Sequence, residues 1–230
     1  MIFSIDHIVF AATPGQRDEL MPALRQAGLA DVGLSLDFPE DGVASQMLGY
    51  RGGGGLEFVT ETDPRHSPAV WFAQVPRVIG VGFASDDFDQ DTRWDGDPGA
   101  WVMDENVPLP DGKVLNIHAA GPHKHKSDFY VFVMDRRDGR LEFPALAGGP
   151  RLARITLAGP DAGWWHDRLA RWLRLPASPG GGLAAGATEL AFTDGPGPAV
   201  RATLSFAAAG DTTVLPLAAG AIELTREPSL

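Results

Sequence analysis

The spacing of hydrophobic and polar positions changes along the first 61 residues and marks a strand, a helix and three more strands. Residues 5–10 form a β-branched and aromatic run that ends before Thr13-Pro14, a pair suited to cap and open a helix. Apolar residues then recur at spacings of three and four over residues 16–27, and Gly28 supplies a helix stop. Three strands are predicted to follow, over residues 32–38, 43–50 and 56–60.

The same order of elements is predicted twice more along the chain. The second pass has strands near 78–83, 101–103, 113–118 and 129–134 and a short acidic segment, 86–94, where the helix belongs. The third has a strand at 153–158, a helix that starts at Ala162, and strands near 189–193, 200–207 and 221–225. We therefore predict an α+β fold in one body, residues 1–230, with βαβββ modules at 3–61, 78–143 and 152–226.

A glutamate between two apolar residues recurs late in each pass. The three triplets are Leu56-Glu57-Phe58, Leu141-Glu142-Phe143 and Ile222-Glu223-Leu224. Such triplets are common in strands, so chance is one explanation. Together with the repeated order of elements, internal duplication is the more economical one.

Charge and composition exclude several classes of function. The formal net charge is -11, which repels phosphate backbones and anionic lipid, and the basic run 123–126 is too short to reverse this. The chain has no cysteine, so a metal site must use histidine nitrogens and carboxylate oxygens. There is no signal-like start and no long apolar run, so we expect a cytoplasmic protein without nucleic-acid or membrane partners.

Four segments carry a recognisable combination of motifs: Asp6-His7-Ile8-Val9 on the first strand, Leu56-Glu57-Phe58 on the fourth, residues 109–115, and Phe129-Tyr130-Val131-Phe132. Together they resemble the glyoxalase-like proteins of the vicinal oxygen chelate superfamily. The resemblance implies curved, mixed and mostly antiparallel sheets around a cleft. It also implies a divalent metal held by His7 and Glu57, and an imidazole with a carboxylate suits zinc, nickel, iron or manganese.

The sequence departs from this pattern where further ligands are expected. Aligning the first strands of the three passes places Gly80 and Arg154 at the position of His7, and neither can bind a metal in its place. Only Glu142, Glu223 or His118 could complete a site with His7 and Glu57.

His118 ends a predicted strand in which it shares a face with Asn116. A histidine and an amide facing the cleft could hold a substrate oxygen. A histidine that bonds a loop carbonyl is an equally good interpretation.

The leading functional hypothesis is a small-molecule enzyme in which a metal at His7 and Glu57 polarises substrate oxygens. Glu142 or Glu223 would serve as the general base, with isomerase, lyase and dioxygenase chemistry all open. The alternative is a metal-free protein that binds or sequesters a small molecule. The expected partners are a small-molecule substrate and a second copy of the chain in a homodimer.

Overall fold

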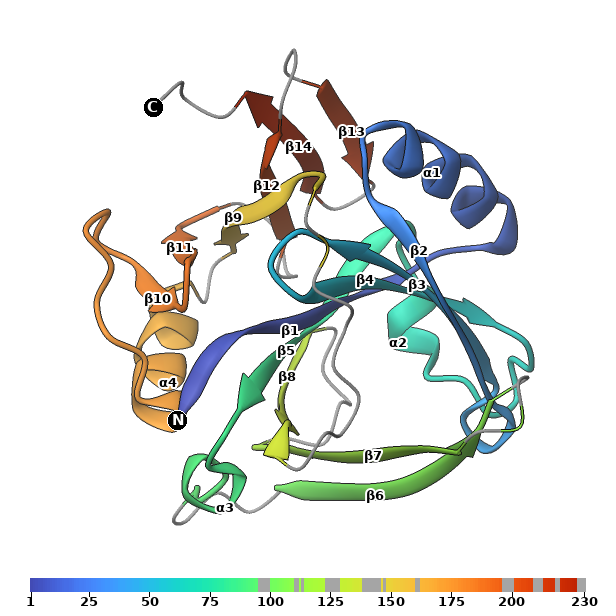
Figure 1. Cartoon of the computed structure of the whole chain (residues 1–230), viewed down its shortest axis with the longest axis horizontal. Coiled ribbons are helices and arrows are strands. Elements are labelled where there is room, and N and C mark those ends of the chain that lie inside the picture. Colours follow the sequence, from blue (N-terminus) through green and yellow to red (C-terminus); the bar gives the residue numbers. More distant parts are fainter. Residues whose placement is uncertain are drawn as a thin grey trace.

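The computed structural model describes residues 1–94, 100–109, 112, 114–122, 129–137, 146, 148–159, 162–195, 201–208, 213–217 and 220–226. Most of these residues belong to two β-sheets, shown in Figure 1. The α+β fold class predicted from the sequence is confirmed. No helix within these ranges is long and apolar enough to cross a membrane.

The larger sheet has eight strands in the order β2-β3-β4-β1-β5-β8-β7-β6. Parallel pairs β1–β4 and β5–β8 flank a central antiparallel pair, β1–β5. Each half therefore has the strand pairing of one βαβββ module. The strands of this sheet are β1 (Ile2–Ala11), β2 (Ala30–Phe38), β3 (Val43–Tyr50), β4 (Gly54–Glu61), β5 (Arg77–Ser85), β6 (Trp101–Pro108), β7 (Val114–Gly121) and β8 (Tyr130–Asp135).

The smaller sheet has six strands in the order β10-β11-β9-β12-β14-β13. It also centres on an antiparallel pair, β9–β12, flanked by the parallel pairs β9–β11 and β12–β14. The strands of this sheet are β9 (Arg151–Ala158), β10 (Leu183–Ala185), β11 (Thr188–Thr193), β12 (Arg201–Ala208), β13 (Thr213–Leu217) and β14 (Gly220–Arg226).

This pairing corrects the division of the chain's C-terminal part. We expected residues 152–226 to form one module, but they form two shortened units. The first, β9-α4-β10-β11, is one strand short of the pattern, and the second has the three strands β12, β13 and β14 and no helix among its described residues. The two strands that the sequence pattern missed, β10 and β13, have only three and five residues and lie at the edges of the sheet. Short edge strands carry little periodic signal.

Helices are few and their ends follow local sequence rules. α1 (Pro14–Gln26) begins at a capping box, in which Thr13 accepts a hydrogen bond from the Gln16 backbone and Gln16 accepts one from the Thr13 backbone. The acidic segment of the second module forms only the single turn α3 (Phe88–Asp91). The other helical segments are η1 (Pro39–Asp41), α2 (Ala69–Phe72) and α4 (Ala162–Leu173).

The convex face of the larger sheet and the inner face of the smaller sheet enclose one hydrophobic core. Ile8 and Val81 from the first sheet and Ile155 and Leu204 from the second belong to this cluster and are almost fully buried. α1 and α4 complete the core, and the predicted stripe on α4 is buried at Trp165, Leu169, Trp172 and Leu173.

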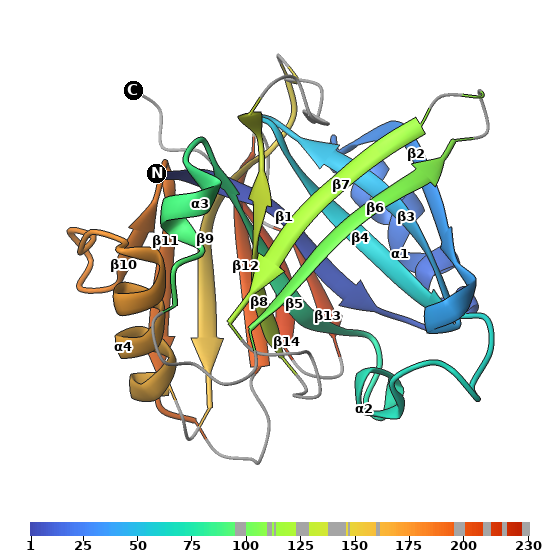
Figure 2. The same ribbon diagram turned by 90° about the horizontal axis from the view of Figure 1, so that it is seen from below.

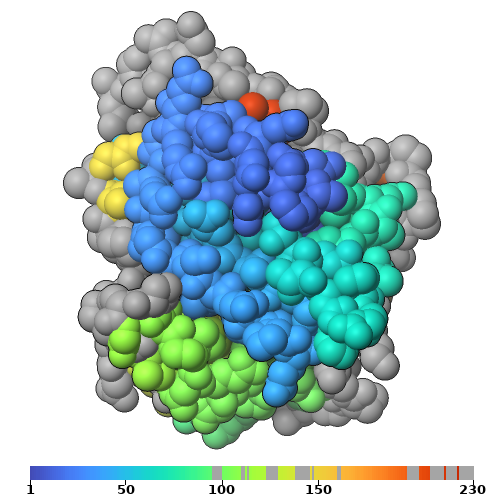
Figure 3. All heavy atoms as spheres, turned by 90° about the vertical axis from the view of Figure 1, so that its right-hand side faces the viewer, coloured from blue at the N-terminus to red at the C-terminus, as the bar shows by residue number. Residues whose placement is uncertain are grey.

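The larger sheet curls until its two edges approach each other. Leu34 and Leu36 of β2 and Met47 of β3 form one buried cluster with Val107 of β6 and Leu115 of β7. Figure 2 shows β6 and β7 crossing over the concave side, and Figure 3 shows the same hairpin in green beside the blue N-terminal strands. The predicted curved sheet around a cleft is thereby confirmed.

A shared core predicts that the two sheets unfold together. Leu204→Ala in the smaller sheet should lower the free energy of unfolding by about 2–5 kcal/mol, because it opens a cavity at a fully buried position. Chemical denaturation followed by circular dichroism and by tryptophan fluorescence should show one shifted transition. Thr203→Ala, its neighbour on the other face, serves as the control and should shift it far less. Two separate transitions would contradict a common core.

Candidate functional site

The concave side of the larger sheet holds a pocket with about 930 Å³ of space free of protein atoms, its open mouth included. Its walls are mainly apolar and aromatic, with few polar groups, which is typical of small-molecule sites. The residues that line it are His7, Leu34, Leu36, Phe38, Asp41, Val43, Met47, Glu57, Val59, Trp71, Trp101, Met103, Leu115, Asn116, Ile117, Ala119, Tyr130, Phe132, Met134 and Arg136.

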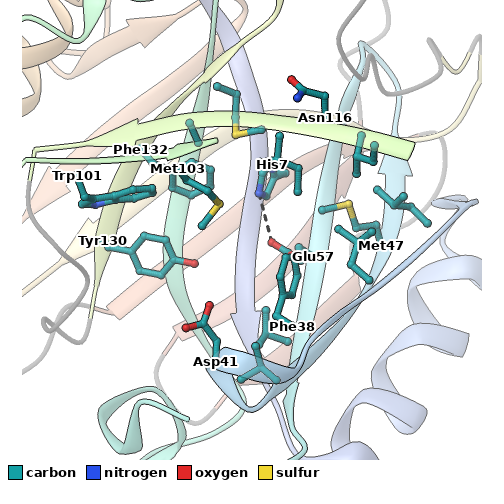
Figure 4. A pocket seen from close by; sticks show the side chains of 18 of the residues that line it. His7, Phe38, Asp41, Met47, Glu57, Trp101, Met103, Asn116, Tyr130 and Phe132 are labelled. Carbon is teal, nitrogen blue, oxygen red and sulfur yellow. Dashed lines mark ion pairs between the residues drawn. The ribbon is translucent and has the colours of Figure 1, made fainter. Parts of the chain in front are cut away.

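His7 and Glu57 meet on the floor of this pocket, as Figure 4 shows. His7 Nε2 lies 3.3 Å from Glu57 Oε2, and both residues are buried. The neighbours of Glu57 on β4, Leu56 and Phe58, point the other way into the core between the sheets. The strand is thus buried on both faces, and the two predicted site residues converge.

A third charged residue, Asp6, contacts the ring nitrogen of His7 that faces away from Glu57. His7 Nδ1 lies 2.6 Å from Asp6 Oδ1. The pairing of β1 with β5 slips at this point, because Ile5 pairs with Phe83 and His7 pairs with Gly82. Asp6 is therefore the extra residue of a β-bulge, a feature that redirects side chains beside functional sites.

Arg136, directly after β8, completes the buried chain of charges. Its Nη2 donates to Asp6 Oδ1 at 2.6 Å, and its Nε donates to Asp6 Oδ2. Charged groups run in the order Arg136, Asp6, His7, Glu57, with alternating sign. Buried charges are tolerated when they are paired in this way.

These contacts fix the charge state of the histidine. Burial alone would lower the pKa of His7, but the hydrogen bonds to Asp6 and Glu57 outweigh it and raise the pKa to about 9. Burial likewise opposes ionisation of Asp6, but Arg136 and His7 together hold the pKa of that carboxyl below its ordinary value. Both ring nitrogens of His7 face carboxylate oxygens, which is the geometry of an imidazolium that donates twice.

The other predicted site residues do not join this pair. His118 lies on β7 but is not among the residues that line the pocket, and its ring centroid lies 4.5 Å from that of Phe88, so the structure does not bring it to His7. Glu223 lies on β14 in the other sheet. Glu142 lies outside the described residues.

Strand pairing identifies the counterpart of His7 in the second module. Across β1 and β5, His7 pairs with Gly82 and Val9 pairs with Gly80. A two-fold axis at the pair formed by Ile8 and Val81 exchanges His7 with Gly80. This is the correspondence that the sequence alignment gave, in which Gly80 stands where a second histidine was expected.

The same relation identifies the counterpart of Glu57. Glu57 pairs with Val9, and Phe132 pairs with Gly82, so Phe132 occupies the position of a second glutamate. In the smaller sheet the four corresponding positions hold Arg154, Ala191, Thr203 and Glu223. Glu223 thus matches Glu57 in register, as the triplets suggested, but in a sheet that does not line the pocket.

Aromatic rings fill the space where further ligands are missing. A Cβ atom on Gly80 would lie 2.8 Å from the ring of Tyr130, and one on Gly82 would lie 2.6 Å from the ring of Phe132. Any side chain at either glycine would collide with these rings. The second half of the site is therefore built as an aromatic wall.

The residues present do not fit a complete metal site. His7 and Glu57 supply two donors, whereas catalytic zinc sites use three protein ligands. Within the described ranges, no group of three or more histidine, aspartate or glutamate side chains is arranged to hold a metal ion. Two donors are therefore too few for chemistry that depends on a metal held by this pair.

Comparisons with known proteins identify the fold. No family model and no curated protein matches the sequence. A hypothetical protein from Staphylococcus aureus is similar in structure, with a TM-score of 0.67 and 10% identity over 97% of this chain and 98% of that one. A variant of 4-hydroxymandelate synthase from Streptomyces coelicolor gives a TM-score of 0.59 and 12% identity over 91% of this chain and 72% of that chain.

A fusion of a xylose isomerase-like TIM barrel with 4-hydroxyphenylpyruvate dioxygenase gives a TM-score of 0.57 and 13% identity. The match covers 92% of this chain and 37% of the fusion protein. Both named enzymes have the vicinal oxygen chelate fold, so the resemblance drawn from the sequence is confirmed at the level of the fold.

Titration of His7 tests the charge chain directly. We expect its imidazole to stay protonated at neutral pH and to lose its proton near pH 9, measured by NMR of ring-labelled histidine. In Asp6→Asn the pKa should fall, because the neutral amide no longer stabilises the buried imidazolium. A His7 that titrates near its ordinary value of 6.5 in the native protein would contradict the arrangement.

Proposed function

We propose that the protein is a small-molecule enzyme of the vicinal oxygen chelate fold that moves a proton between its substrate and the His7–Glu57 pair. The observation that carries the proposal is the contact of 3.3 Å between His7 Nε2 and Glu57 Oε2 on the floor of an otherwise apolar pocket. Residues with strongly perturbed pKa values in a cleft are candidates for catalysis, and the pKa of His7 is raised to about 9 here.

The pair has the two parts that an enolisation needs. Glu57 accepts a proton from the carbon next to a substrate carbonyl, and the C–H electron pair moves toward the carbonyl oxygen. The Nε2–H of His7 donates a hydrogen bond to that oxygen as its negative charge grows. Return of the proton to the same carbon restores the substrate and exchanges its hydrogen with solvent. In an α-hydroxy carbonyl compound, the hydroxyl proton moves to the former carbonyl oxygen, and Glu57 returns its proton to the former carbonyl carbon, which yields the isomer. If the carbon on the other side of the reacting carbon carries a leaving group, departure of that group with its bonding electron pair yields a lyase reaction.

Asp6 and Arg136 act as positioning residues in this proposal. Asp6 fixes the ring plane of His7 through Nδ1, so that Nε2 faces Glu57 and the pocket. Arg136 in turn holds Asp6 ionised. Apolar walls around the pair keep the local dielectric constant low, which strengthens each of these interactions.

Two other interpretations of the pocket make different predictions. A metal enzyme has one feature in its favour, because a carboxylate on Nδ1 is also the usual partner of a metal-bound histidine. Against a metal enzyme stands the number of donors, because His7 and Glu57 supply only two. A metal-free binding or sequestering protein is favoured by the aromatic wall, and it would bind the same ligands without turnover.

Hydrogen exchange at carbon tests the proposal even though the substrate is unidentified. We expect the protein to catalyse deuterium incorporation next to the carbonyl of at least one compound in a panel of aryl and alkyl ketones and keto acids in D₂O, followed by proton NMR. Glu57→Gln should slow this exchange by about 100-fold or more, because it removes the base.

Glu19→Gln on α1 is the matched control, since it makes the same change on an exposed helix surface and should leave the exchange unchanged. Unchanged exchange in Glu57→Gln would contradict the proposed base. Saturable binding of a panel member without any exchange would support the binding or sequestering protein instead.

A further inference from the structure

One wall of the pocket is a continuous row of aromatic rings. Trp71 stacks on Tyr130 with ring centroids 5.5 Å apart, and Tyr130 stacks on Phe132 at the same separation. The edge of the row meets His7, whose ring centroid lies 5.0 Å from that of Phe132. Trp101, from β6, adds a partly exposed ring to the same pocket. Aromatic faces carry negative electrostatic potential and attract cations.

The charged side chains that line the pocket differ in whether they are already paired with a group of opposite charge. The two cationic ones, Arg136 and His7, are already held by the carboxylates of Asp6 and Glu57. Asp41 brings a further carboxylate, from the exposed turn η1. Counting Asp6, the group has three anionic and two cationic members, so its balance is negative.

Two further carboxylates, Glu40 and Glu105, add to the negative charge in the neighbourhood of Asp41. Partial burial, and then the charges of Asp41 and Glu40, raise the pKa of Glu105. Tyr130 is also close to acidic groups, since burial and then Glu57 and Asp41 raise its pKa. Figure 4 shows its hydroxyl pointing into the space shared with Asp41 and Glu57. The net charge of -11 favours the approach of cations over a longer range.

We infer that the pocket takes an organic cation, a small molecule with an ammonium group on an apolar or aromatic body. The ammonium group lies at the mouth, between the carboxylate of Asp41 and the partly exposed rings of Tyr130 and Trp101. The body reaches inward along the apolar wall toward His7 and Glu57. This inference rests on the proposed function, because it names the class of substrate for the same pocket.

Three probes of nearly equal size separate charge from shape: 2-phenylethylammonium, 2-phenylethanol and 3-phenylpropionate. Their dissociation constants at pH 7.5 are measured by NMR titration of the whole protein. We expect the cation to bind at least about tenfold more tightly than the anion, with the alcohol between them. Asp41→Asn should reduce the preference for the cation severalfold and leave the affinity for the alcohol unchanged.

Asp37→Asn is the matched control. It removes the same charge from β2, but Asp37 does not line the pocket, whereas its neighbour Phe38 does. The inference fails if the cation and the anion bind equally, if the cation does not bind at 10 mM, or if both variants weaken it equally. None of these results bears on proton transfer, which the exchange assay reads separately. Hydrogen exchange without a preference for the cation would support the proposed function and contradict the inferred class of ligand.

Discussion

The site depends on one buried carboxylate. Asp6 accepts hydrogen bonds from Arg136 and from His7, and all three side chains are nearly inaccessible to solvent. Without Asp6, two cationic groups would face each other in the interior at a cost of several kcal/mol. Because Arg136 follows the last strand of the second module and Asp6 lies on the first strand of the first, the same contact joins the two halves of the larger sheet.

The second half of the larger sheet has no metal-binding or acid–base side chains at the positions that match His7 and Glu57. Where the two-fold relation calls for polar groups, it has Gly80 and Phe132, and aromatic rings lie over the glycine backbone. The first half of the sheet therefore supplies His7, Glu57 and Asp6, and the second half supplies the rings of Tyr130 and Phe132 together with Arg136. This arrangement suits a ligand whose apolar body packs against the aromatic rings while its reacting group faces His7 and Glu57.

The resemblance to glyoxalase-like proteins predicted that His7 and Glu57 converge, and the two side chains are in contact. Alignment of the repeats placed Gly80 at the position of a second histidine, and the strand pairing is consistent with that alignment. Asp6 was missed as a partner of His7 because alternation assigns neighbouring residues to opposite faces, and the bulge that overrides it has no sequence signal of its own. Arg136, 130 residues away, could be found only in three dimensions.

The division of the C-terminal part failed for a related reason. Two three-stranded units with short edge strands have nearly the same hydrophobic pattern as one four-stranded unit, so only the pairing of β9 with β12 distinguishes them. Glu223 shows the consequence. Its register matches that of Glu57, yet the smaller sheet places it away from the pocket.

Paired charges, rather than a metal, occupy the floor of this pocket. The most direct test is anomalous diffraction from crystals grown in millimolar zinc or nickel. We expect no anomalous peak between His7 and Glu57, with Nε2 and Oε2 remaining in direct contact. A strong peak coordinated by both side chains and by a third protein ligand would contradict this expectation.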